Sequence, residues 1–268
     1  MLVKRIVSAL IGIPLLIYLI YEGKLIFLAG VVFFTLIGIC EFRNLLLRIN
    51  LRVPAIIMYG NGALFPIIIY LYPRITQPIA LYAGITCFLM LHLIVMISCF
   101  PRYSAAEIAV SYLGSSYIGI LTSYLILMRY ISPNGFYYLL YVLIMTWSYD
   151  TGAYFTGILW GRHLLCPSLS PKKTVEGVVG GLFFTICAAL LFQRLHPLFA
   201  YFDNLALALL IGIFVQVGDL VESTFKRMAA VKDSGTLIPG HGGLLDRFDG
   251  LLFSVPVAYF YLKLLLFR

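Results

Sequence analysis

Acidic and basic side chains gather in one stretch of the chain, between Asp219 and Asp249. Its first part places five polar residues at helical positions i, i+3, i+4, i+7 and i+8, which makes one polar stripe on a helix: Asp219, Glu222, Ser223, Lys226 and Arg227. Carboxylates bind magnesium, and basic side chains bind phosphate. The stripe therefore suits metal-assisted chemistry on phosphate groups, although ion pairs at a solvated helix end would produce the same pattern.

A glycine-rich segment follows directly and strengthens this interpretation. His241 lies among three glycines, and such a backbone can approach an anion closely. Asp246 and Asp249 are three residues apart, so one face of a helix would offer both carboxylates to a cation. Each motif alone is common by chance, and a lone histidine is usually structural. Their combination with the polar stripe within 31 residues favours a functional site.

Two further groups of polar residues lie upstream. Ser170, Lys172 and Lys173 precede an apolar run that begins near Val175. A helix N-terminus and two lysines suit a chain of phosphates, while a basic loop that only fixes topology is the alternative. Asp150 lies inside an apolar run, where a carboxylate costs about 2.5–3.5 kcal/mol and so needs a partner or a function. A helix-packing residue bonded to a neighbour is the alternative for Asp150.

The composition identifies the kind of protein that must position these residues. Of the 268 residues, 62% are hydrophobic and 11% are charged, and the mean hydropathy is +1.00. Soluble domains carry about 25% charged residues, so an ordinary soluble enzyme and a disordered chain are excluded. The apolar runs are long and continuous, which argues against an outer-membrane barrel. The predicted fold class is all-α, a polytopic helical membrane protein.

Apolar runs separated by proline, glycine and charge predict about nine transmembrane helices. The residues from 103 to 115 are the most polar of these runs, so a short interfacial helix ahead of the span is an alternative there. The nine expected spans are 6–21, 25–41, 53–72, 79–100, 109–128, 136–159, 175–193, 205–221 and 250–267.

The distribution of basic residues orients these spans. If the N-terminus is cytosolic, thirteen of the nineteen Lys and Arg residues fall in cytosolic segments and six fall outside. The positive-inside rule expects this bias, although some of the cytosolic residues are also candidates for the site. We therefore expect a cytosolic N-terminus and a multi-pass protein of the cell inner (cytoplasmic) membrane. The net charge of +8 then reflects orientation, and no nucleic-acid partner is expected.

Acidic residues divide the chain into two regions. Only three precede residue 145, namely Glu22, Glu41 and Glu107, whereas eight lie from Asp150 onward. We expect residues 1–100 to be transmembrane scaffold helices. Residues 101–268 are expected to form a transmembrane catalytic region whose site faces the cytosol.

The stretch from Ser223 to Asp249 resembles the signature of the phosphatidate cytidylyltransferases, or CDP-diacylglycerol synthases. The SPKKTVEG segment from Ser170 and the pair Asp150 and Tyr154 are also similar to that family. The resemblance is strong from about residue 147 to 250 and extends to the first 100 residues only in hydropathy and length. The signature positions are Ser223, Phe225, Lys226, Arg227, Lys232, Asp233, Gly235, Ile238, Pro239, His241, Gly242, Gly243, Leu244, Asp246, Arg247, Phe248 and Asp249.

The resemblance implies transfer of a cytidylyl group from CTP to phosphatidate, giving CDP-diacylglycerol and pyrophosphate. Both reactants are anionic phosphates, and Mg2+ would reduce their repulsion. The expected catalytic residues are Asp219, Asp246, Asp249, Lys226, Arg227 and His241, of which the three aspartates are the magnesium ligands. The expected substrate-binding residues are Ser170, Lys172 and Lys173 for the CTP triphosphate, with Asp150, Lys232 and Arg247. His241 would contact phosphate rather than act as a base, because phosphatidate is already ionised.

Two other classes of membrane protein fit the data less well. CDP-alcohol phosphotransferases and prenyltransferases also use aspartate-bound magnesium, but their aspartate spacings are absent from this chain. A transporter would use Asp150 as a coupling site and would not need the HGG-x-x-D-R-x-D pattern. The expected partners are therefore CTP, phosphatidate and the lipid bilayer, and whether the chain forms a homodimer is left open.

Overall fold

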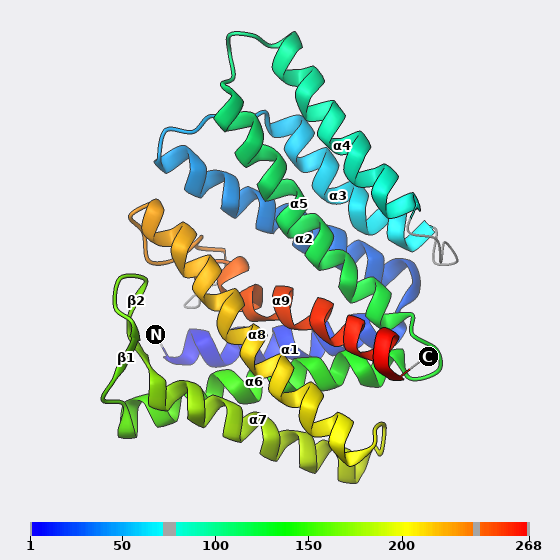
Figure 1. Cartoon of the computed structure of the whole chain (residues 1–268), viewed down its shortest axis with the longest axis vertical. Helices are drawn as coiled ribbons and strands as arrows, with labels where there is room; N and C mark the ends of the chain where they lie inside the picture. Colours follow the sequence, from blue (N-terminus) through cyan, green and yellow to red (C-terminus); the bar gives the residue numbers. More distant parts are fainter. Residues whose placement is uncertain (1, 72–78, 238–241, 267–268) are drawn as a thin grey trace. The chain divides into compact units, whose positions relative to one another are not determined.

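The chain folds into long helices joined by loops and one small hairpin (Figure 1). The computed structural model describes residues 2–71, 79–237 and 242–266. The helices in these residues are α1 (Leu2–Glu22), α2 (Lys24–Arg48), α3 (Ala55–Leu71), α4 (Ile79–Ser98), α5 (Ala105–Arg129), α6 (Gly135–Trp160), α7 (Val175–Leu195), α8 (Tyr201–Met228) and α9 (Leu245–Tyr261), followed by the π-helical turn η1 (Leu262–Leu266). The strands are β1 (Leu164–Cys166) and β2 (Ser170–Thr174).

Each of the nine expected apolar spans coincides with one helix, so the prediction of a helical protein is confirmed. Within the described residues, α2, α5, α7 and α8 are long and apolar enough to cross a membrane. Shorter apolar helical stretches are 10–22, 55–71 and 83–98. The number of spans and the cytosolic N-terminus stay predictions.

Helix α5 is continuous, so no separate interfacial helix forms at 103–115. Ser104 begins it with a capping box, in which the Ser104 hydroxyl accepts from Glu107 N at 3.2 Å and the Glu107 carboxylate accepts from Ser104 N at 2.8 Å. These reciprocal bonds satisfy free N–H groups of the first turn. The polar residues that suggested an interfacial segment thus start a long helix.

The fold is not entirely α-helical, because β1 and β2 form an antiparallel hairpin ahead of α7. Pro171 favours extended backbone in β2, since its ring fixes φ near −65°. Thr174 is also extended, and its hydroxyl caps α7 by accepting from Gly177 N at 3.1 Å. The segment ahead of α7 is therefore held in a defined conformation.

The chain divides into two compact units. The first unit comprises residues 1–131 and 228–246, and the second comprises residues 132–227 and 247–268. Each unit therefore combines segments that are far apart in the sequence. The expected separation of roles between residues 1–100 and 101–268 stays a prediction.

Buried polar contacts join the helices of the first unit. Helices α2, α3 and α5 pack against one another, and α4 packs on α3 and α5 (Figure 1). Thr35 on α2 and Thr122 on α5 share a hydrogen bond of 2.8 Å. His92 on α4 lies 2.9 Å from Asn61 on α3 and 3.2 Å from Ser111 on α5. Such contacts matter in membrane helices, because lipid is as apolar as the side chains it surrounds.

A buried asparagine joins three helices of the second unit. Helix α6 lies along α7 (Figure 1). The Asn204 side chain on α8 accepts from Tyr141 Oη on α6 at 2.9 Å and donates to the Ala189 carbonyl on α7 at 3.1 Å. Tyr149 on α6 donates to Gln216 on α8 at 3.0 Å. These bonds fix the register of the helices that carry the candidate site.

Candidate active site

Two glycines bring α8 and α9 into close contact beside the predicted metal ligands. A Cβ on Gly218 would overlap the carbonyl group of Asp249 and lie 3.0 Å from its carbon. A Cβ on Gly250 would lie 2.8 Å from Val215 Cγ1 on α8. Asp219 follows Gly218 directly, so the helix crossing puts Asp219 and Asp249 within range of each other's charge.

Three aspartates from three helices form an acidic cluster in the second unit: Asp150, Asp219 and Asp249. Asp249 interacts electrostatically with both other carboxylates, and Asp150 interacts with Asp219. The cations Lys173 and Arg247 act on Asp150. Like charges repel at this range, so the cluster depends on nearby positive charge. Five sequence-predicted residues of the second unit are thus brought together, namely the three aspartates with Lys173 and Arg247.

The β-hairpin is joined to α8 by two contacts. Lys173 on β2 forms an ion pair with Asp219. Arg227 Nε, near the end of α8, donates to the Leu169 carbonyl at 2.9 Å. Lys172 is exposed on the same strand. The basic hairpin and the polar stripe of α8, separated by about 45 residues of sequence, are therefore in direct contact.

Glu176 fixes the base of the hairpin, and the sequence analysis did not single it out. Its carboxylate accepts from the backbone N–H groups of Arg162 at 3.0 Å and His163 at 3.2 Å. It also bonds His163 Nδ1 at 2.6 Å. Glu176 lies in the first turn of α7, where a negative charge is favourable. The sequence feature that could have identified Glu176 is its position two residues after Thr174, which caps that helix.

Lys226 and Arg227 are adjacent in sequence but have different surroundings. Lys226 is 9% exposed and pairs with Glu222, which is 0% exposed, one turn earlier on α8. This is the intrahelical ion pair that the sequence analysis gave as the alternative for the stripe. Arg227 is exposed. Of the two cations among the expected catalytic residues, Arg227 is the one whose side chain is accessible.

Asp246 belongs to the first unit, where its carboxylate holds a loop. Its Oδ2 accepts from Ser234 N at 2.9 Å, Ser234 Oγ at 3.0 Å and Gly243 N at 2.8 Å. Lys232, two residues before Ser234, is exposed. The predicted residue His241 lies outside the described residues. The assignment of Asp219, Asp246 and Asp249 to one metal site stays a prediction.

The donor type of these carboxylates suits magnesium, which prefers oxygen ligands. In the described parts of the chain, however, no three Asp, Glu, His or Cys side chains are arranged to hold a metal ion. Lys173 is the positive group that pairs with Asp219. The three aspartates thus have the right oxygen atoms to bind a divalent cation. In this structure, however, the positive charge beside them comes from Lys173, which pairs with Asp219.

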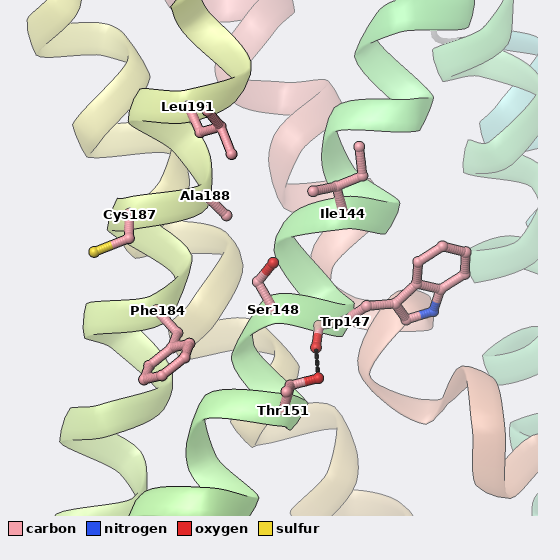
Figure 2. A pocket seen from close by; sticks show the side chains of 8 residues that line it. All are labelled: Ile144, Trp147, Ser148, Thr151, Phe184, Cys187, Ala188 and Leu191. Atoms are coloured by element: carbon pink, nitrogen blue, oxygen red, sulfur yellow. Dashed lines mark hydrogen bonds between the residues drawn. The ribbon is translucent and has the colours of Figure 1, made fainter.

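A groove lies between α6 and α7, and two of its lining residues, Ser148 and Thr151, are close to Asp150 in the sequence (Figure 2). Its volume is about 400 Å³. Thr151 donates its hydroxyl to the Trp147 carbonyl at 2.7 Å, so this polar group is satisfied within its own helix. The groove is therefore suited to hydrocarbon. Its lining residues are Ile144, Trp147, Ser148 and Thr151 on α6 and Phe184, Cys187, Ala188 and Leu191 on α7.

The sequence analysis also missed Glu41 on α2. Its carboxylate is buried and accepts from the backbone N–H groups of Leu244 at 2.8 Å and Leu245 at 2.7 Å. The available signal was its scarcity, since Glu41 is one of three acids in the first 145 residues and ends an apolar run.

Apolar helices that hold facing carboxylates and cations are typical of functional sites in membrane proteins. The sequence model described as "Cytidylyltransferase family" matches residues 3–265. The chain therefore belongs to the cytidylyltransferase family.

Similar proteins of known name point to one activity within that family. A phosphatidate cytidylyltransferase of Staphylococcus aureus is 32% identical over 261 residues, which cover 94% of this chain and 96% of that protein. One from Staphylococcus epidermidis is 35% identical over 263 residues with the same coverage. One from Bacillus subtilis is 44% identical over 159 residues, which span 59% of each chain.

Proposed function

We propose that the protein is a phosphatidate cytidylyltransferase. A phosphatidate oxygen attacks the α-phosphorus of CTP, the bond to pyrophosphate breaks, and CDP-diacylglycerol forms. The observation that carries the proposal is the similarity to proteins of this name over 94% of the chain. The ion pair between Lys173 and Asp219 also supports it, because it unites the basic hairpin with the polar stripe.

The hairpin binds the nucleotide, and the end of α8 binds the lipid headgroup. Ser170, Lys172 and Lys173 hold the CTP triphosphate, since lysine is a hydrated point charge that suits flexible phosphates. Arg227 holds the phosphate of phosphatidate, and its planar guanidinium can bind two oxygens at once. Its bond to the Leu169 carbonyl keeps the two phosphate-binding groups close together. Asp150, Lys232, Arg247 and His241 complete the surroundings of the substrates.

The repulsion between two anionic reactants is the main barrier that the site must reduce. Magnesium, when bound by Asp219, Asp246 and Asp249, supplies positive charge for this purpose. Lys173 and Arg227 contribute fixed positive charge on the protein side. Phosphatidate is ionised near neutral pH, so no residue needs to remove a proton before the attack.

The reaction takes place on the cytosolic side of the inner membrane, in a chain of nine spans with a cytosolic N-terminus. CTP is water-soluble, whereas the acyl chains of phosphatidate stay in the bilayer. The apolar groove between α6 and α7 accommodates part of one acyl chain. A C-terminal reporter that is active only in the cytosol tests this topology, since nine spans require it to be silent.

Incorporation of CTP labelled in its cytosine ring tests the activity. Purified protein in detergent is supplied with phosphatidate and magnesium, and label should enter a lipid product. Label that stays water-soluble would contradict the proposal. A CDP-alcohol phosphotransferase needs CDP-diacylglycerol, which this assay does not supply, so such an enzyme and a transporter would both leave the label water-soluble.

A further inference from the structure

A buried glutamate of α2 caps the helix that starts at the end of the signature. Glu41 is 5% exposed. Its Oε1 accepts from Leu244 N at 2.8 Å and its Oε2 from Leu245 N at 2.7 Å. The first N–H groups of a helix lack an intrahelical acceptor, and α9 begins at Leu245. A residue 203 positions earlier therefore performs the role that a local side chain usually performs.

One serine connects Glu41 to Asp246. The Ser234 hydroxyl lies 3.3 Å from Glu41 Oε2 and 3.0 Å from Asp246 Oδ2. The same Asp246 oxygen accepts from Gly243 N at 2.8 Å. Three consecutive N–H groups, from residues 243 to 245, are thus taken up by two carboxylates that share a hydroxyl. A change in the position of Glu41 will shift the donors that orient Asp246.

The glycines around Glu41 are explained by the space that its carboxylate requires. A Cβ on Gly243 would lie 2.7 Å from Glu41 Oε2, and a Cβ on Gly235 would lie 2.6 Å from Glu41 Oε1. A side chain at either position would have to displace the carboxylate. Gly243, a signature position, therefore makes room for Glu41, which lies outside the signature, and also for the Ser234 hydroxyl, which a Cβ there would overlap.

We propose that Glu41 is a positioning residue of the cytidylyl transfer. It fixes the backbone of residues 243–245 and, through Ser234, the orientation of Asp246. This inference rests on the proposed function. A carboxylate inside an apolar helix is costly, and its two backbone N–H bonds offset that cost only while α9 begins at Leu245. Misplacement of a reacting group by about 1 Å can cost roughly 10²-fold in rate, so a small shift of Asp246 matters.

Glu41→Gln tests the inference, because glutamine has the same shape but presents an NH2 group where one acceptor oxygen was. We expect kcat to fall by about 10-fold to 10²-fold. The magnesium concentration for half-maximal activity should rise, while KM for CTP stays close to the wild-type value. Wild-type protein is assayed alongside, so absence of CDP-diacylglycerol in that sample would refute the proposed function rather than the role of Glu41.

Glu107→Gln is the matched control. Glu107 also accepts from two backbone N–H groups, of Arg52 at 2.7 Å and Ser104 at 2.8 Å, and it lies in the same unit. It has no bond to the 234–246 segment in the described contacts. We expect Glu107→Gln to lower the thermal midpoint and to leave kcat and the magnesium requirement unchanged.

Two outcomes would overturn the inference. The first is a Glu41→Gln protein that has a lower thermal midpoint but wild-type kcat and magnesium requirement, because Glu41 would then be only a cap. If Glu41→Gln does not fold, Ser234→Ala decides, since it keeps the cap and removes the shared hydroxyl. The second outcome is a Ser234→Ala protein with wild-type kcat and wild-type magnesium requirement. A lower kcat with a higher magnesium requirement in Ser234→Ala supports the inference.

Discussion

Three carboxylates of the first unit and three of the second have different kinds of partner. In the first unit, Glu41, Glu107 and Asp246 accept hydrogen bonds from backbone N–H groups. Such donors belong to the fold and are not displaced by a substrate. These carboxylates therefore fix where helices begin and how the 234–246 segment is held.

In the second unit, Asp150, Asp219 and Asp249 act on one another and on side-chain cations. Facing carboxylates repel, so this arrangement does not stabilise the fold by itself. Groups of this kind are retained where a ligand or metal ion supplies the missing positive charge. The comparison separates Glu41 and Glu107, whose partners belong to the fold, from the three facing aspartates of the second unit. Asp246 combines both features, because the fold holds its carboxylate and we propose it as a magnesium ligand.

Asp219→Asn should have the largest effect. The substitution keeps the shape of the side chain and removes the charge that pairs with Lys173. We expect turnover to fall by about 10²–10³-fold or more, because the site loses a group that organises charge around the transferred phosphate. Labelled CTP incorporation measures the rate, and size-exclusion chromatography confirms that the protein is folded.

Asp203→Asn is the control on the same helix. Asp203 accepts from Tyr261 Oη at 2.8 Å and lies sixteen residues from Asp219, or about 24 Å along α8. The Asp203→Asn protein should be somewhat less stable than wild type and should keep its activity. If Asp219→Asn kept wild-type turnover and magnesium dependence, the chemical role assigned to the aspartates of the second unit would be wrong.

The cations of the second unit should separate the two substrates. Lys173→Ala is expected to raise KM for CTP, and Arg227→Ala is expected to raise KM for phosphatidate, each by up to about 10²-fold. The reason is that Lys173 lies on the hairpin, whereas Arg227 lies near the end of α8. Saturation curves for each substrate, at a fixed saturating level of the other, measure both effects.

Arg194→Ala serves as the control, because Arg194 lies in the last turn of α7, at the opposite end from the hairpin. Both KM values should stay at wild-type levels in that variant. If Lys173→Ala affected phosphatidate and Arg227→Ala affected CTP, the two phosphate sites would be exchanged. Equal effects on both substrates would indicate one shared binding region.

Much of the fold could be predicted from the sequence because it depends on local composition. Long apolar runs bounded by glycine, proline and charge located every helix, with ends that differ from the observed ones by up to seven residues. The β-hairpin was missed, since strands of three and five residues leave no periodic signal. The continuous start of α5 was left open, although Ser104 and Glu107 have the spacing of a capping box.

The site was predictable where its residues stand in one motif and not where contacts are distant. Asp219 and Arg227 stood out because they lie on one stripe of α8. Glu41 did not, because its bonds to residues 244 and 245 span more than 200 positions and create no pattern in either segment. The separation of Lys226 from Arg227 was also hidden, since neighbouring positions on a helix differ in burial only after packing.

Glu222→Gln should have the smallest effect on activity and so sharpens the comparison. Glu222 lies in the second unit, yet its partner is the buried Lys226 on the same helix, so we assign it an architectural role. Removing one member of a buried ion pair costs about 3–5 kcal/mol, and glutamine should fall toward the lower end because it can still accept a hydrogen bond from Lys226. We therefore expect a lower thermal midpoint in detergent and an unchanged kcat for the folded fraction. A change in KM for phosphatidate without loss of stability would contradict this, because it would mean that Lys226 leaves Glu222 to bind the lipid phosphate during turnover.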